Sequence, residues 1–501
     1  MNVPAAGGRL AHKIINNTSL LVGSEFFSRV AGFVAGILIA RSLGRESYGQ
    51  FSLVYTYLAF FETFVQFGLN SILVRELSQS EDRAGRILGN AVLFRIALII
   101  LAFPVSVALM RALGYPMAVR QAALLAYFQL FLSLRSIYET IFRVHLALIY
   151  PACWNAIRGI ANVLLVAMVA WWQPALPWFI LAYMVSGAIA FAGIASNSRR
   201  FQRLDFRFDW PITKHLIREA APLVASAYLT LLYYRIDVFM ISKMRGFGEV
   251  GCYSVAMKVT ESLAMIASAV MASLFPVLAR SFKEDRAAFE RQIMRASEAF
   301  FLLGFPIALG SLFVSRDLIL LLFGPEYASS APTLAILCWH IFFAFQGTLL
   351  ANTLIVCGRQ KVDMWISFFL VFLNIALNAL LIPKWGFAGA AVATVATEAF
   401  GAVFYLTYAS RDRKIAYPIS LGMLGRVVKI NVIFFIYLVL LNALFRVRGI
   451  PLIFSGAVFY GGLLMLERVI TWQDASHYLA GLFKVSRMPK NDLPLKKTEG
   501  A

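Results

Sequence analysis

Charged side chains stand inside several long apolar stretches of this sequence. In membrane helices such residues are rare and usually functional, because a charge at mid-membrane costs at least about 2.5–3.5 kcal/mol and needs a partner or a wet cavity. Arginine can bind a diphosphate through two parallel hydrogen bonds, whereas buried carboxylates can carry protons or cations. The residues concerned are Glu25, Arg29, Glu62, Arg95, Arg135, Glu139, Arg158, Arg235, Asp237, Lys258, Glu261 and Glu398.

Three cations are the main candidates for binding an anionic group such as a diphosphate: Arg29, Arg235 and Lys258. The alternative interpretation is local neutralisation, since acidic residues lie three or four positions from Arg29 and Lys258 and would face them on a helix. The other candidates are Arg95, Arg135 and Arg158 for substrate binding, and Glu62, Asp237 and Glu398 for coupling to an ion.

The composition is that of a membrane-embedded chain. Of 501 residues, 60% are hydrophobic and 14% are charged, whereas soluble domains have roughly 25% charged residues. The mean hydropathy is +0.74. A membrane helix needs about 20 apolar residues, so the apolar stretches predict an all-α integral membrane protein with about fourteen transmembrane helices. These figures exclude a soluble enzyme, a nucleic-acid-binding protein and a disulfide scaffold.

Basic residues are concentrated on one side of the predicted membrane. Loops on the side of the N-terminus hold most of them, including residues 199–218, 280–295 and 411–429 and the C-terminal tail. By the positive-inside rule, we expect both termini to be cytoplasmic. The net charge of +20 is then a topology signal and a surface for anionic lipids.

An internal repeat relates two halves of the chain. Residues 12–24 and 48–52 each resemble a stretch that lies 202 positions later. This alignment places Arg29 over Leu231, one turn before Arg235. Six spans per half is an even number, so we expect two parallel lobes around a central cleft, which is the geometry of alternating-access transport.

The repeat and the loops together predict six segments. They are a cytoplasmic N-terminus (1–13), an N-lobe of six spans (14–198), a cytoplasmic linker (199–216), a C-lobe of six spans (217–410), two extra spans (411–472) and a cytoplasmic tail (473–501). The sequence contains no GK[ST] phosphate loop, no HExxH and no zinc-type cysteine spacing. We therefore expect a transporter rather than an enzyme, without metal, cofactor or nucleic acid.

Short motifs recur along the chain in a characteristic order. The first half contains Ala40–Gly49, Phe67–Leu69 and Val74–Glu76, and the second half contains Leu322–Tyr327, Asn352–Gly358, Gly386–Thr394 and Glu398. Together they resemble the polysaccharide flippases, a branch of the multidrug/oligosaccharidyl-lipid/polysaccharide exporter superfamily. The resemblance covers residues 10–470.

This resemblance implies fourteen helices and two lobes around a cleft that opens outward. It implies movement of an undecaprenyl-diphosphate-linked oligosaccharide repeat unit from the inner to the outer leaflet of the bacterial inner membrane, for polysaccharide biosynthesis. The implied partners are membrane lipids and the polysaccharide polymerase and glycosyltransferases of the same pathway. Related lipid II flippases use arginines at the lobe interface. Arg29 matches the one in the first helix, whereas Arg235 and Lys258 match only as cations of the second lobe.

Two other functions compete with this interpretation. A cation-coupled multidrug antiporter of the same fold would use intramembrane carboxylates, but the first span has Glu25 near its cytoplasmic end and no central aspartate. A membrane-embedded glycan polymerase would need a sizeable domain on the outer side, where the predicted loops are short.

Overall fold

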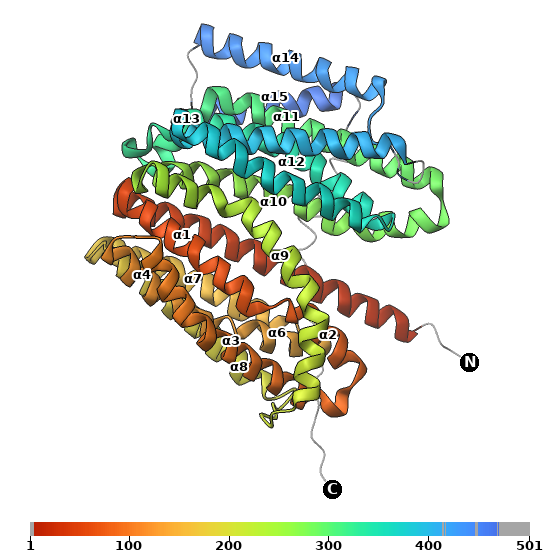
Figure 1. The fold of residues 1–501 in the computed structure, drawn as a ribbon. Coiled ribbons are helices and arrows are strands. Elements are labelled where there is room, and N and C mark those ends of the chain that lie inside the picture. Colours follow the sequence, from red (N-terminus) through yellow and green to blue (C-terminus); the bar gives the residue numbers. More distant parts are fainter. Residues whose placement is uncertain (1–4, 413–414, 416, 446–448, 468, 470–501) are drawn as a thin grey trace, which may run out of the picture. The chain divides into compact units, whose positions relative to one another are not determined.

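The computed structural model describes residues 5–412, 415, 417–445, 449–467 and 469, and this part is helical without strands (Figure 1). Ten of its helices are long and apolar enough to span a membrane, and the bent helix α9 (Trp210–Met244) adds an eleventh. The predicted all-α membrane fold is confirmed, and the number of fourteen spans stays a prediction. The predicted tail, residues 473–501, lies outside the described residues.

The chain divides into two compact units, one that ends at Ser420 and one that begins at Leu421. In the second unit, Lys429 Nζ of α14 (Leu421–Phe445) lies 2.6 Å from a carboxylate oxygen of Glu467, which follows α15 (Ile450–Leu466). The first unit contains α1 (Ala5–Gln66), α2 (Leu69–Gln79), η1 (Glu81–Arg83), α3 (Ala84–Ala112), α4 (Met117–Tyr127), α5 (Gln129–Leu132), α6 (Arg135–Val144), α7 (Ile149–Trp172), α8 (Leu176–Ser198), α9, α10 (Phe247–Glu284), α11 (Arg286–Phe323), η2 (Pro325–Tyr327), α12 (Ser330–Val356) and α13 (Gln360–Arg411).

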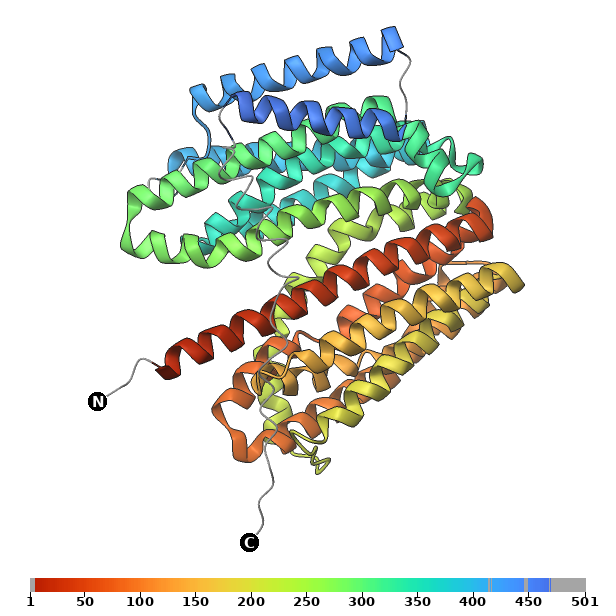
Figure 2. The same ribbon diagram turned by 180° about the vertical axis from the view of Figure 1, so that it is seen from behind.

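Helices α1 to α8 form one lobe of the first unit, the N-lobe, and α9 to α13 form the C-lobe (Figure 1). Helix α1 packs against α7 in its own lobe and against α10 of the other. The ribbons of the two lobes converge at the end where α1 reverses and α10 begins, called here the turn end, and diverge toward the opposite end (Figure 2). A buried core that includes Tyr48, Tyr253 and Tyr327 spans both lobes.

Single glycines reverse the chain at the turn end. Gly44 inside α1 has φ 71° and ψ 171°, and Gly246 before α10 has φ 93° and ψ 177°. Only glycine adopts such positive φ values without strain. The two turns are 202 residues apart and have similar dihedral angles, which is what the repeat in the sequence predicts.

Residues 117–142, predicted as one span, are interrupted and form three short helices, α4 to α6. Arg95 of α3 is fully buried beside this interruption, and its Nη1 donates to the carbonyl oxygen of Ser133 at 3.2 Å. Its Nη2 donates to the carbonyl oxygen of Gln66 at 3.1 Å, where α1 ends. A carbonyl that leaves the helical ladder inside a membrane needs another donor. Arg95 is one such donor at both breaks, and Ser136 also donates to the Ser133 carbonyl through its N–H and its hydroxyl.

Candidate functional site

The lobes meet at the turn end through contacts that follow the 202-residue repeat. The hydroxyl oxygens of Ser52 and Ser254 lie 2.6 Å apart. A Cβ built on Gly49 or Gly251 would lie 1.8 Å or 2.0 Å, respectively, from a carbonyl oxygen of the opposite lobe. The helices can therefore cross this closely only because both residues are glycine, and the cleft between the lobes is closed at this end.

A central chamber of about 220 Å³ lies between the lobes, lined by α1, α8, α9 and α10. Arg235 and Lys258 both line it, so the structure brings two of the three main candidate cations together. Arg235 Nη1 lies 3.2 Å from Glu261 Oε1, and more than a third of each side chain is exposed. Exposed ion pairs are weak, so an incoming anion can replace Glu261. Lys258 lies against Gly36 of α1, where a Cβ would be 2.4 Å from its Cε.

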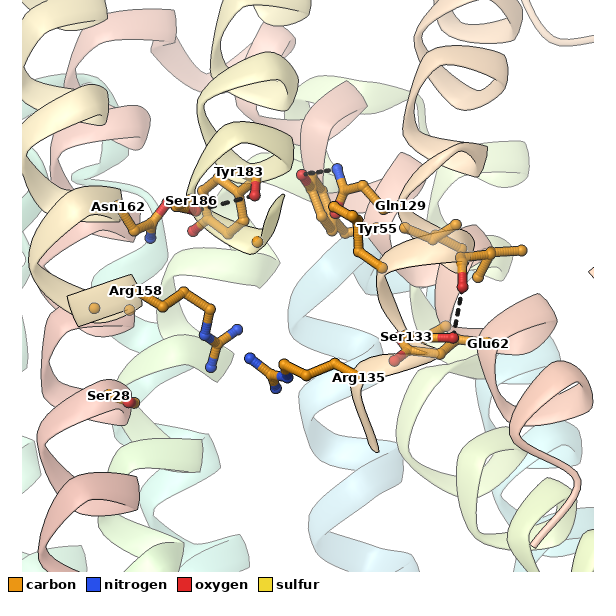
Figure 3. A pocket seen from close by; sticks show the side chains of 17 residues that line it. Ser28, Tyr55, Glu62, Gln129, Ser133, Arg135, Arg158, Asn162, Tyr183 and Ser186 are labelled. Atoms are coloured by element: carbon orange, nitrogen blue, oxygen red, sulfur yellow. Dashed lines mark hydrogen bonds between the residues drawn. The ribbon is translucent and has the colours of Figure 1, made fainter. Parts of the chain in front are cut away.

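A second chamber of about 360 Å³ lies within the N-lobe. The side chains of Arg135 and Arg158 point toward each other across it (Figure 3). Arg135 Nε pairs with Glu139 Oε1 at 3.2 Å, whereas the buried Nε of Arg158 has no hydrogen-bond partner among the described residues. Two facing guanidinium groups repel each other unless water or an anion separates them, so the N-lobe chamber has the charge to hold an anionic or strongly polar group.

Aromatic residues form the wall between the two chambers. Tyr55 and Tyr183 line both, and their ring centroids are 5.3 Å apart. Phe51 lies 4.6 Å from the Tyr55 ring, and the Tyr55 hydroxyl accepts a hydrogen bond from Gln129 Nε2 at 2.8 Å. Sequence reasoning missed this wall, although Tyr48, Phe51 and Tyr55 follow each other at steps of three and four, which places them on one helix face.

Two of the predicted substrate residues line neither the central chamber nor the N-lobe chamber. Arg29 is exposed on α1, two turns or about 10.5 Å before Gly36 on the same helix face. Arg95 gives its Nη hydrogens to four oxygens within the N-lobe, those of Gln66, Asn70, Ser133 and Ser136. The structure therefore places Arg29 near the face that Lys258 contacts and places Arg95 in the packing of the N-lobe.

The three candidate coupling carboxylates lie in three different chambers. Glu62 lines the N-lobe chamber, and Asp237 lines the central chamber, where it is buried and accepts a hydrogen bond from the hydroxyl of Tyr253. Glu398 lines a third chamber, of about 220 Å³, inside the C-lobe and accepts a hydrogen bond from the Tyr233 hydroxyl at 2.5 Å. No pair of them shares a chamber among those that the described residues form.

A family model described as polysaccharide biosynthesis protein matches residues 14–282, more than half of the chain. The chain belongs to this family. A second model, MatE, matches residues 222–380. The predicted resemblance to the polysaccharide flippase branch of the exporter superfamily is confirmed, as is a multi-pass membrane protein.

Individual proteins of known name are also similar to this chain. The chain is 27% identical over 191 residues to "Capsular polysaccharide biosynthesis protein CapF" of Staphylococcus aureus, a match that spans 38% of the chain and about half (48%) of that relative. It is 25% identical over 408 residues to "Probable low-salt glycan biosynthesis flippase Agl15" of Haloferax volcanii, covering 79% of the chain and 84% of the relative. The fold resembles that of "Lipid II flippase MurJ, inward closed conformation", with a TM-score of 0.70 and 16% identity over 90% of this chain and 100% of that one.

Proposed function

We propose that the chain is an alternating-access flippase for an undecaprenyl-diphosphate-linked oligosaccharide repeat unit. It would move this lipid from the inner to the outer leaflet of the bacterial inner membrane, with both termini in the cytoplasm. The observation that carries the proposal is a pair of chambers that each contain two basic side chains beside acidic ones and that share one aromatic wall. The relatives' names, a capsular polysaccharide biosynthesis protein and a probable glycan biosynthesis flippase, support a lipid-linked oligosaccharide as the cargo.

The central chamber is the proposed site for the diphosphate. Arg235 can exchange its single contact with Glu261 for two charge-assisted hydrogen bonds to phosphate oxygens, and Lys258 adds a second positive charge in the same chamber. Arg29 lies farther from the turn end on the helix face that Lys258 contacts. It would therefore meet the diphosphate on its way into the chamber.

The N-lobe chamber is the proposed site for the sugar residues that follow the diphosphate. It is lined by the polar side chains of Gln129 and Asn162, the two guanidinium groups of Arg135 and Arg158, and the Tyr183 ring. Such a surface offers hydrogen bonds to hydroxyl groups and an apolar face to a sugar ring. The guanidinium of Arg158 would donate to the sugar, since its Nε has no described partner.

The energy for the step would come from rocking of the lobes and from the membrane potential. A negative head group that moves outward gains about 2.3 kcal/mol per charge per 100 mV. Proton or sodium coupling would use Glu62, Asp237 or Glu398. A polysaccharide polymerase and glycosyltransferases of the same pathway are the proposed protein partners.

The direct test is transbilayer movement of a fluorescent lipid-diphosphate oligosaccharide in proteoliposomes. We expect Arg235→Ala and Lys258→Ala to slow it by about tenfold or more, because each removes a charge-assisted contact, and Arg29→Ala to slow it as well. Arg111→Ala removes an exposed arginine at the end of α3 and should leave the rate unchanged. A wild type that moves no lipid contradicts the flippase proposal, and wild-type rates in the Arg235 and Lys258 variants contradict the diphosphate site.

A cation-coupled multidrug antiporter is the second candidate, favoured by the acidic C-lobe chamber and the MatE match. Asp363 lines that chamber together with Glu398 and accepts a hydrogen bond from Tyr405 at 2.7 Å. This function predicts that wild-type vesicles accumulate a cationic dye against a proton gradient, that Glu398→Gln abolishes the accumulation and that Arg235→Ala does not.

A further inference from the structure

An apolar groove of about 510 Å³ lies between the second half of α1, α3 and α9, and it is larger than the central chamber and the N-lobe chamber. No charged side chain lines it among the described residues. Two tyrosine hydroxyls are its polar side-chain groups, and the other lining side chains are aliphatic or phenylalanine rings, with Phe60, Phe64, Leu101, Leu232 and Phe239 among them. An apolar chain fits this chemistry and a sugar or a phosphate does not, because either would lose its hydration without gaining partners.

The groove and the central chamber are the two sides of one helix pair, α1 and α9, which comes from different lobes. Ala59 of α1 lines the central chamber, and the next residue, Phe60, lines the groove. On α9, Arg235 lines the chamber and Ile236 lines the groove. The lobe seam between α1 and α9 therefore separates the proposed diphosphate site from an apolar surface.

The contacts across this lobe seam include one side-chain hydrogen bond and several ring contacts. The Tyr228 hydroxyl donates to the carbonyl oxygen of Phe60 at 2.8 Å. The ring of Phe60 lies 5.4 Å from that of Phe239 and 6.5 Å from that of Tyr228. A single hydrogen bond and a few aromatic pairs are weak interactions. Separating α1 from α9 beside Phe60 therefore costs little compared with the gain from burying a long apolar chain.

We infer that the groove binds the polyisoprenyl chain of the substrate while its diphosphate occupies the central chamber. This inference rests on the proposed function. The two parts of the substrate are covalently joined, and each methylene of the polyisoprenyl chain loses favourable burial when it leaves an apolar environment. The polyisoprenyl chain must therefore leave the polar chamber by the shortest apolar path. The lobe seam supplies that path, because the groove lies directly behind Arg235 on the same helix.

Site-specific photocrosslinking in the full-length chain tests the occupant. p-Benzoylphenylalanine replaces Leu101, which lines the groove and is 67% exposed, or Leu164 on α7, which is 64% exposed and outside the groove. The probe is a radiolabelled polyprenyl-diphosphate oligosaccharide in proteoliposomes. We expect a labelled adduct at Leu101 that excess unlabelled probe displaces, and at least about fivefold less label at Leu164. Equal labelling at both positions, or a phospholipid adduct alone at Leu101, would overturn the inference.

Filling the groove gives an independent test. Loss of burial for only two methylene groups weakens chain binding by about tenfold, so Val105→Trp and Leu232→Trp should slow movement of the long-chain probe by about tenfold. A probe with a short prenyl chain should be slowed much less, and Leu164→Trp should slow neither. Equal rates for wild type and both groove variants would contradict the groove. The proposed function would still stand, because it fails only when the wild type moves no lipid.

Discussion

The polar partners of a charged side chain decide what that side chain can do inside a membrane. Arg95 and Arg158 both stand on apolar helices of the N-lobe. Arg95 gives four hydrogen bonds to protein oxygens and is fully buried. Arg158 lines a chamber and faces a second arginine. We therefore expect substitutions of Arg95 to change stability and substitutions of Arg158 to change substrate handling.

Arg95→Ala should destabilise the protein by about 2–4 kcal/mol, because it removes four buried hydrogen bonds, one of them to the carbonyl oxygen of Gln66 where α1 ends, and opens a cavity. The measurement is the thermal unfolding midpoint in detergent. Arg158→Ala is the matched control and should leave the midpoint nearly unchanged. An unchanged midpoint in Arg95→Ala would contradict the structural role.

Gly36→Val should weaken transport without removing any charge. A Cβ at this position would lie 2.4 Å from Lys258 Cε, so the lysine must move away from α1 and from its place in the central chamber. We expect the apparent substrate affinity to fall by about tenfold, as for loss of one charge-assisted contact. Gly310→Val makes the same change where no atom lies within 4 Å and should have wild-type affinity. Equal affinities in the two variants would show that the position of Lys258 does not matter.

At the scale of the helices, glycine determines where the elements turn and how closely they cross. Gly44 and Gly246 reverse the chain, and Gly49 and Gly251 let α1 and α10 approach until backbone meets backbone. Each pair is separated by 202 positions, so glycines form the turn and the close helix crossing at equivalent places in the two lobes. The crossing closes the cleft at the turn end. We propose that it must open during each transport cycle.

A disulfide across this crossing should stop transport reversibly. The hydroxyl oxygens of Ser52 and Ser254 are 2.6 Å apart, so cysteines at both positions can form a bond with small adjustments. In a background without the four native cysteines, oxidation of the Ser52→Cys/Ser254→Cys variant should abolish lipid movement, and reduction should restore it. Each single variant is the control. Unimpaired movement by the oxidised double variant would show that the turn end stays closed throughout the cycle.

At the scale of the whole molecule, the distribution of basic loops predicts which end faces the cytoplasm. The turn end is the predicted outer end, so this structure would be closed on the outside and suited to accept substrate from the inner leaflet. The outward-opening cleft that the resemblance implies would then be the other state of the same cycle. This assignment depends on the orientation of the chain in the membrane.

Thiol labelling in intact cells tests that orientation. In the cysteine-free background, Gln173→Cys lies between α7 and α8 at the turn end, and Arg203→Cys lies between α8 and α9 at the opposite end. Both native residues are exposed. A membrane-impermeant maleimide should label only the first in intact cells and both after lysis. The reverse pattern would invert the topology and place the closed end of the cleft in the cytoplasm.

Features that depend on local chemistry could be predicted from the order of residues alone. Membrane helices can be predicted from the length of the apolar stretches, because a segment that spans the membrane must satisfy its own backbone hydrogen bonds. The repeat at 202 positions is a property of the order of residues, and the charged residues inside spans are visible as exceptions to the apolar pattern. Arg235 and Lys258 could be selected in this way, and the structure places them in one chamber.

The three-dimensional structure was needed to show which of these residues meet, because the rotation and crossing of helices depend on packing between distant segments. It separated Arg29 from the central chamber, directed Arg95 to two helix breaks and set Arg135 opposite Arg158. It also revealed the aromatic wall and the apolar groove, whose residues look like ordinary membrane-helix side chains in the sequence. Apolar residues face the lipid along every span. The sequence alone therefore does not distinguish those that line a groove, and only their neighbours in the structure do.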